Sequence, residues 1–184
     1  MPSHRFHGDI VIQRRDEAIS CARIASRHQP TGLNIRLHLF CDASRAWDSD
    51  RGGIAITYNS LLPDPDRSSQ PRVPVRIAYP IDRLLDSNLG EFIAVAEALF
   101  TAAQEIARIS RSPQPCGMVV RVKVFNDNQY NLEYLMGRRH VHNPEFLRIL
   151  EHVLDLIARQ SRALQTTPAV DVRLALHWIP GHHH

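Results

Sequence analysis

Hydrophobic residues along the chain follow two periods, one typical of strands and one typical of helices. Five segments alternate apolar with polar residues or are largely apolar, and each is bounded by residues that favour turns. The first three follow one another without a helix between them, which predicts an antiparallel meander. The predicted strands lie at 33–41, 54–58, 75–81, 119–125 and 172–178.

Helical spacing of apolar residues fills much of the remaining chain. Asn88, with Glu91 three residues on, has the pattern of a capping box, and Asn143 precedes a proline as an N-cap often does. Gly137 is expected to end a short helix. The predicted helices lie at 16–27, 88–111, 129–136 and 144–157.

The order of these elements indicates an α/β fold. Three strands, a helix, a strand, further helices and a last strand predict a mixed five-stranded sheet, with three strands antiparallel and two parallel and with helices packed on its faces. The connections through helices should be right-handed crossovers. We divide the chain into an N-terminal extension, 1–31, and one domain over 32–184.

Composition is that of an ordinary globular protein. The chain has 184 residues, of which 43% are hydrophobic and 22% charged, so a disordered protein is excluded. No apolar run is long enough to span a bilayer, and the first residues lack the apolar core of a signal peptide. Three distant cysteines, Cys21, Cys41 and Cys116, offer neither a disulfide framework nor zinc-ligand spacing. We therefore expect an intracellular protein, nuclear or cytoplasmic, without a membrane partner, and a monomer by default.

The net charge of +3 comes almost wholly from arginine, since Lys123 is the one lysine. The planar guanidinium group can bind two phosphate oxygens at once, which suits a nucleic-acid partner. A coding sequence rich in arginine codons would give the same composition, so charge permits such a partner without establishing it.

Two aspartates occupy equivalent places in the pattern. Asp42 ends the first predicted strand and Asp127 follows the fourth, each two residues after a phenylalanine, Phe40 and Phe125. If these strands are parallel neighbours, both carboxylates project from one edge of the sheet and repel unless a cation offsets them. Oxygen ligands of this kind suit Mg²⁺, although either aspartate alone could simply be a turn residue.

Two further residues are candidates with competing explanations. Glu91 could bring a third carboxylate to the same edge or merely cap its helix. His182 follows Trp178 and a Pro-Gly turn in a way that a purification tag would not, whereas His183 and His184 remain open to either origin. His140 and His142 could bind a metal, but the stretch RRHVHNP is more typical of an exposed loop.

Four motifs, in order, resemble those of ribonuclease H-like domains. They run from about Leu33 to His182: LHLFCDAS before two glycines, NLGEFIAVAEAL, VKVFNDNQYNLEYL and LALHWIPGH. The last is similar to the Trp-x-Pro-Gly-His loop of the retroelement-like and fungal branch. The resemblance implies the same fold and a metal-dependent endonuclease that hydrolyses the RNA strand of RNA/DNA hybrids.

By position in these motifs, the resemblance implies metal ligands at Asp42, Glu91 and Asp127 and a mobile catalytic histidine at His182. Two Mg²⁺ ions, with Mn²⁺ as a substitute, would flank the scissile phosphate, with Asp42 between them. The 2′-hydroxyl groups of the RNA strand would be read across the minor groove. The family places a fourth carboxylate in a helix after the histidine loop, and the chain stops before it, so weak activity is expected.

Two other functions stay open. A degenerate ribonuclease H-like module would bind nucleic acid or a protein without cutting, and a sister exonuclease or resolvase could use the same sheet. The loop from Trp178 to His182 argues against the second.

Overall fold

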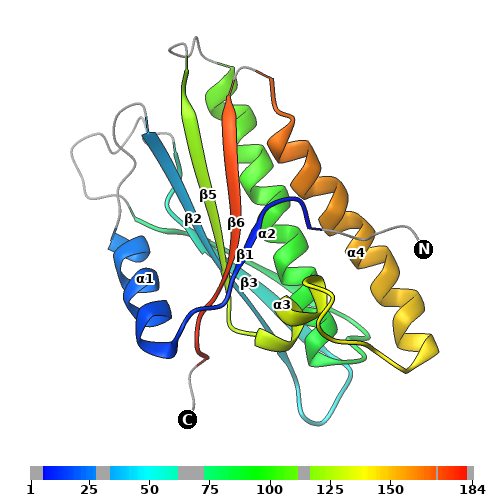
Figure 1. Cartoon of the computed structure of the whole chain (residues 1–184). Coiled ribbons are helices and arrows are strands. Elements are labelled where there is room, and N and C mark those ends of the chain that lie inside the picture. The colour runs from blue at the N-terminus through cyan, green and yellow to red at the C-terminus, as the bar shows by residue number, and fades with distance from the viewer. Residues whose placement is uncertain (1–5, 28–33, 62–72, 112–116, 169, 182–184) are drawn as a thin grey trace.

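The structure is a computed structural model that describes residues 6–27, 34–61, 73–111, 117–168 and 170–181. Its described part holds one six-stranded mixed sheet and four helices (Figure 1). In chain order these are β1 (Asp9–Val11), α1 (Arg15–Arg27), β2 (Asn34–Arg45), β3 (Gly52–Tyr58), β4 (Val75–Ile81), α2 (Ser87–Ser110), β5 (Val119–Asn126), α3 (Gln129–Leu135), α4 (Pro144–Gln165) and β6 (Asp171–Trp178).

The strands lie in the order β1-β6-β5-β2-β3-β4. β2, β3 and β4 form the antiparallel meander, while β5 pairs parallel with β2 on one side and with β6 on the other. This is the mixed arrangement that the resemblance to ribonuclease H-like domains predicts, and the α/β class is confirmed.

The expected number of five strands was wrong by one. β1, from the segment treated above as an extension, pairs parallel with the outer edge of β6. Three residues are too few to show an alternating pattern in the sequence. They form a strand because they pair with the exposed edge of β6, and that edge is not evident from the sequence. Nearby contacts hold this segment, because Phe6 is buried in the core and the His7 backbone N–H donates to Ser161 Oγ of α4 at 3.0 Å.

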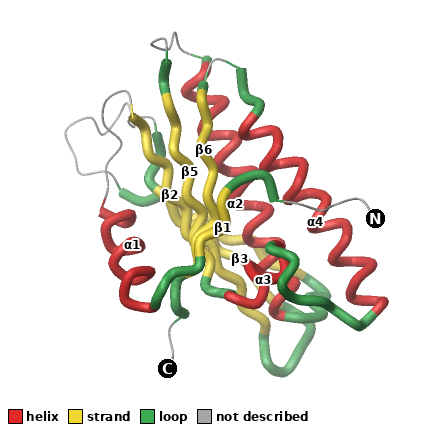
Figure 2. The backbone as a smooth tube through the Cα atoms, viewed as in Figure 1, coloured by secondary structure: helices red, strands yellow, loops and turns green. Residues whose placement is uncertain are grey.

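Helices cover the two faces of the sheet unequally. α2 and α4 pack side by side on one face, and the shorter α1 lies on the other (Figure 1, Figure 2). The first face is the apolar row of each strand, for example Leu37, Leu39, Val122 and Val124, which are fully buried against residues such as Phe92 of α2. Hydrophobic burial on this side holds the sheet and α2 in a fixed relation.

Helix ends follow the sequence with two corrections, one of which is that α4 runs to Gln165, beyond its predicted end at 157. Asn143 caps α4 and accepts hydrogen bonds from two backbone N–H groups, and Gly137 after α3 has a φ of 73°, as predicted. The cap of α2, however, is Asp86 rather than Asn88, since its carboxylate accepts from the Asn88 backbone N–H at 2.7 Å. The helix therefore begins at Ser87, and Glu91 does not occupy the capping-box position that the sequence predicted for it.

Among the described residues, no helix is long and apolar enough to cross a membrane.

Candidate metal centre

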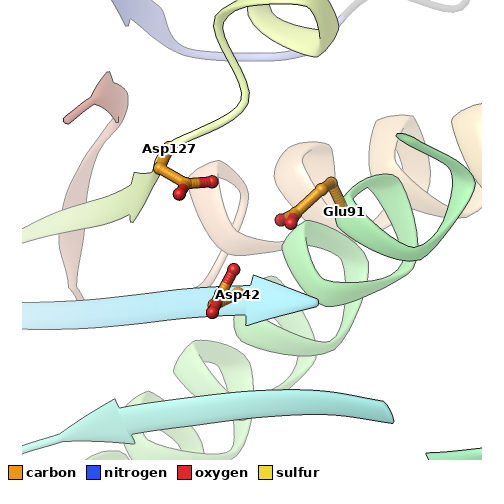
Figure 3. A group of neighbouring side chains, drawn as sticks. All are labelled: Asp42, Glu91 and Asp127. Atoms are coloured by element: carbon orange, nitrogen blue, oxygen red, sulfur yellow. The ribbon is translucent and has the colours of Figure 1, made fainter. Parts of the chain in front are cut away.

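Asp42 and Asp127 lie towards the carboxyl ends of β2 and β5, and they come together because these strands are parallel neighbours in register. The last pair of that register is Phe40 with Phe125, whose rings stack with centroids 4.7 Å apart. Two residues beyond each phenylalanine, Asp42 and Asp127 come side by side (Figure 3). The repeated Phe-x-Asp spacing thus places two carboxylates together.

The sequence suggested that Asp42 ends its strand, but the strand continues beyond it. β2 continues to Arg45, because residues 43–45 keep pairing with β3 after β5 has diverged, and Asp42 itself lies opposite Ala55. The aspartate is therefore anchored by backbone pairing on one side and open on the other, and its side chain is exposed.

Glu91 joins the two aspartates from near the N-terminal end of α2, as the fifth residue of the helix. Its side chain is buried, at 5% exposure, and one ligand oxygen from each of Asp42, Glu91 and Asp127 lies within 4.8 Å of the others (Figure 3). The Ala43 backbone N–H donates to Asp42 Oδ1 at 2.9 Å and to Glu91 Oε1 at 3.1 Å. A single amide thus fixes both carboxylates.

Asn126 was missed by the sequence reasoning and positions Glu91 from the other side. Its side chain is completely buried, and Nδ2 donates to Glu91 Oε2 at 2.7 Å and to the Cys41 carbonyl at 3.3 Å. Its Oδ1 accepts from the Asn128 backbone N–H at 3.1 Å. Asparagine is common in turns, so an asparagine at the end of a strand does not by itself indicate a functional role. The feature of the sequence that could have identified Asn126 is its position directly before Asp127.

The electrostatics of the cluster favour a bound cation. Burial is the main cause that raises the pKa of Glu91, to about 8. The hydrogen bonds from Asn126 and Ala43 lower this pKa, and the neighbouring charges of Asp42 and Asp127 raise it. Burial likewise raises the pKa of the Cys41 thiol, which accordingly stays neutral. Without a cation the cluster therefore holds a proton at neutral pH, and a cation would replace it.

The end of β6 packs against Asp127. The Trp178 indole Nε1 donates to the Asp127 carbonyl at 3.0 Å. Gly181 lies so close that a Cβ there would be 2.5 Å from Asp127 Oδ2. The Trp-x-Pro-Gly sequence thus has a structural role beside the cluster, while His182 lies outside the described residues.

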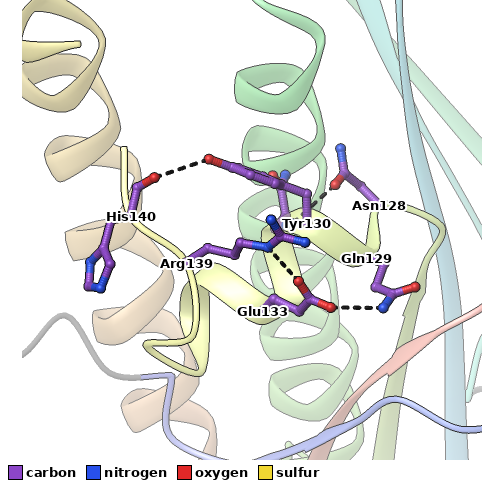
Figure 4. Close-up of polar contacts among 7 residues, drawn as sticks. Asn128, Gln129, Tyr130, Glu133, Arg139 and His140 are labelled. Atoms are coloured by element: carbon purple, nitrogen blue, oxygen red, sulfur yellow. Dashed lines mark hydrogen bonds and ion pairs between the residues drawn. The ribbon is translucent and has the colours of Figure 1, made fainter. Parts of the chain in front are cut away.

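α3 carries a polar network next to the same edge (Figure 4). Glu133 accepts hydrogen bonds from Arg139 Nε at 2.7 Å and from Gln129 Nε2 at 2.8 Å, and the Tyr130 hydroxyl donates to the His140 carbonyl at 3.4 Å. The segment that holds His140 and His142 is exposed, as expected for a loop. A pocket of about 530 Å³ opens between this segment and the start of α2.

The three carboxylates fit a divalent cation. Oxygen ligands on opposite sides of one ion, at about 2.1 to 2.4 Å each, lie about 4.2 to 4.8 Å apart. The observed spread of 4.8 Å is thus compatible with one shared ion after small side-chain rotations. An all-oxygen set suits Mg²⁺ or Mn²⁺ better than zinc, which favours nitrogen and sulfur.

No protein-family model and no curated protein matches the sequence. Solved structures that resemble the chain include ribonuclease H1 from the halophilic archaeon Halobacterium salinarum, with 18% identity and a TM-score of 0.45 over 79% of this chain and 86% of that one. A second is the N-terminal ribonuclease H domain of a Mycobacterium tuberculosis protein, with 16% identity and a TM-score of 0.45 over 80% and 88%. A third is LC11 ribonuclease H1 in complex with an RNA/DNA hybrid, with 12% identity and a TM-score of 0.46 over 78% and 85%.

Proposed function

We propose that this chain is a metal-dependent endonuclease of the ribonuclease H type that cleaves the RNA strand of RNA/DNA hybrids. The observation that carries the proposal is the convergence of Asp42, Glu91 and Asp127, from two parallel strands and one helix, within 4.8 Å. The buried hydrogen bonds that orient Glu91 support it, because functional carboxylates are held by neighbouring groups in this way.

In this proposal Asp42, Glu91 and Asp127 hold Mg²⁺, or Mn²⁺ in its place. The bound cation would offset negative charge on the phosphate and acidify a water molecule. Asp42, which is exposed, faces the side from which a phosphate can approach. Asn126 and the Ala43 amide keep Glu91 from turning away, so the carboxylates need little rearrangement when substrate binds.

Polar groups beside the centre offer contacts to a nucleic acid. Gln129 begins α3, Arg138 lies in the segment that follows this helix, and both residues are exposed. Side-chain amides and arginines bind sugar hydroxyls and phosphates, and 2′-hydroxyl groups distinguish RNA from DNA. We assign the hybrid as substrate on this chemistry and on the resemblance of the sequence motifs.

The test is cleavage of a labelled RNA/DNA hybrid beside matched duplex DNA and single-stranded RNA, with Mg²⁺, with Mn²⁺ and with EDTA. We expect cut RNA only from the hybrid and only with metal. Asp127→Asn should lose at least about a hundredfold in rate while its circular dichroism spectrum stays that of the wild type, because Asp127 lies outside the core. Equal cutting of all three substrates, or cutting in EDTA, would exclude the proposed activity.

A degenerate module that binds nucleic acid or a protein without cutting is the alternative. It would bind the hybrid in a gel-shift assay and leave the RNA strand intact at every metal concentration. The same assay therefore separates the two functions, since cleavage that depends on Asp127 contradicts the alternative.

A further inference from the structure

The sheet face opposite α2 and α4 carries a block of positive charge beneath α1. Arg36 on β2 pairs in register with Arg121 on β5, and two residues further along His38 pairs with Lys123. Arg121 is also opposite Arg173 on β6. Adjacent strands are about 4.8 Å apart, and like charges directly opposite one another destabilise a sheet. Folding therefore gathers cations that an anion would stabilise.

A pocket of about 710 Å³ lies between this block and α1. Arg36, His38, Arg121 and Lys123 line it from the sheet, and Cys21 with Ile24 lines it from the helix. Its size falls within the range of small-molecule sites, which is roughly 300 to 1,000 Å³. The pocket therefore has cationic side chains on the side of the sheet and partly apolar side chains on the side of α1.

The neighbouring contacts leave the cations available. Lys123 Nζ donates a hydrogen bond to Cys21 Sγ at 3.9 Å, which is a long and weak contact. Asp16 and Glu17, at the start of α1, also line the pocket, but in the described part of the chain neither forms an ion pair with Arg36, Arg121 or Lys123. Three permanent cations against two carboxylates leave the pocket with one excess positive charge.

We propose that this pocket is a second site, which binds a phosphorylated anion of nucleotide size. Guanidinium groups bind phosphate oxygens two at a time, and an ammonium group adds a point charge. Lys123 and Arg121 lie on β5 and precede Asp127, the residue directly after this strand, by four and six residues, which is about 13 to 20 Å at 3.3 Å per residue. The site is thus separate from the carboxylate centre. A free nucleotide and the phosphorylated end of a single strand offer the same chemistry.

Alkylation of Cys21 reports on the pocket without using nuclease activity. The full chain would carry Cys116→Ser, since Cys116 lies outside the described residues, and Cys41 is buried. Iodoacetamide labelling would be followed by mass spectrometry in EDTA, which leaves the carboxylates without metal. At a ligand concentration about ten times Kd, labelling of Cys21 should slow about tenfold, because a ligand in the pocket covers the thiol.

Three probes distinguish the sources of the phosphate: inorganic triphosphate, ATP and a 5′-phosphorylated single-stranded DNA tetramer. Protection by triphosphate and ATP alone assigns a free nucleotide or polyphosphate, whereas protection by the tetramer at lower concentration assigns a strand end. Sodium chloride at matched ionic strength serves as the control for simple screening.

Matched variants test the residues. Arg121→Gln and Lys123→Gln should each raise the Kd about tenfold or more. Arg173→Gln removes the same charge from the same face, but Arg173 is outside the pocket and near Asp171 at 3.5 Å, so its Kd should change less than about twofold. The proposal is overturned if none of the probes protects Cys21 at millimolar concentration, or if Arg173→Gln weakens protection as much as Arg121→Gln.

Discussion

Asn126 is the residue on which the orientation of Glu91 depends most. It is fully buried and donates to both Glu91 Oε2 and the Cys41 carbonyl. We predict that Asn126→Ala lowers the affinity for Mn²⁺ by about 10- to 100-fold, as removal of a group that orients a metal ligand does. The variant should also lose about 1 to 3 kcal/mol of unfolding free energy, because buried polar partners are left unpaired. Calorimetric metal titration and urea unfolding measure the two effects, and unchanged Mn²⁺ affinity would contradict the role of Asn126.

Glu91 predicts how stability depends on pH when no metal is bound. Its folded pKa of about 8 is above the ordinary value of 4.5, so between these limits the folded protein binds a proton that the unfolded chain releases. The contribution of Glu91 to the unfolding free energy should therefore be fully present below pH 4.5. It should be lost as the pH rises towards 8, by an amount on the order of a few kcal/mol. Urea unfolding in EDTA at pH 5 to 9 measures this change.

Glu91→Gln should remove this part of the pH dependence, and the variant should be more stable than the wild type at pH 8 without metal. Glu97→Gln, which takes a carboxyl group from the same helix away from the cluster, is the matched control and should keep the wild-type slope. A slope that is the same in all three proteins would refute the burial of a protonated Glu91.

At the scale of elements, the contact between α2 and β2 sets the height of Glu91 above the sheet. A Cβ on Gly90 would lie 3.0 Å from Ala43 Cβ and 3.0 Å from a methyl group of Leu84, tighter than ordinary packing. We predict that Gly90→Ala shifts α2 outward and costs about 1 to 3 kcal/mol, less the roughly 1 kcal/mol that alanine gains in a helix. Cleavage should fall because Glu91 moves with the helix.

Gly181→Ala is the companion variant at the end of β6. Its Cβ would displace the Asp127 carboxylate directly, without disturbing the core. We expect a loss of cleavage comparable to that of Gly90→Ala with a stability change below about 0.5 kcal/mol, measured by urea unfolding. Full activity in Gly181→Ala would show that Asp127 does not need its present position.

The sequence predicted those elements whose burial repeats at a regular period. Alternation located β2 and β5, and the shared Phe-x-Asp spacing predicted that Asp42 and Asp127 would meet if the strands were parallel neighbours, as they are. It could not locate β1, which is three residues long, or the role of Asn126, because both depend on partners distant in the sequence. The N-cap of α2 was misplaced because Asp86 and Asn88 are both good caps and tertiary contacts choose between them.

For the whole molecule, the two faces of the sheet differ in their side chains, since one is apolar and the other carries charged residues. The face under α2 and α4 is apolar and supplies the core, so it fixes the strands without using a charged residue. The other face carries Arg36, Arg121 and Lys123, and Asp42 and Asp127 lie further along the chain on β2 and just after β5. If this face binds a phosphate-bearing partner, as proposed above, substitutions there should affect binding more than stability.

The central claim is that Asp42, Glu91 and Asp127 form a metal site, and thermal unfolding with and without divalent cation tests it most directly. Binding to the folded state alone stabilises it by mass action, by about 2.7 kcal/mol when the cation is at 100 times its Kd. We predict that millimolar Mg²⁺ or Mn²⁺ raises the melting temperature of the wild type by several degrees and leaves that of Asp42→Asn unchanged. A wild-type melting curve that divalent cations do not move, or an equal shift in Asp42→Asn, would contradict the claim.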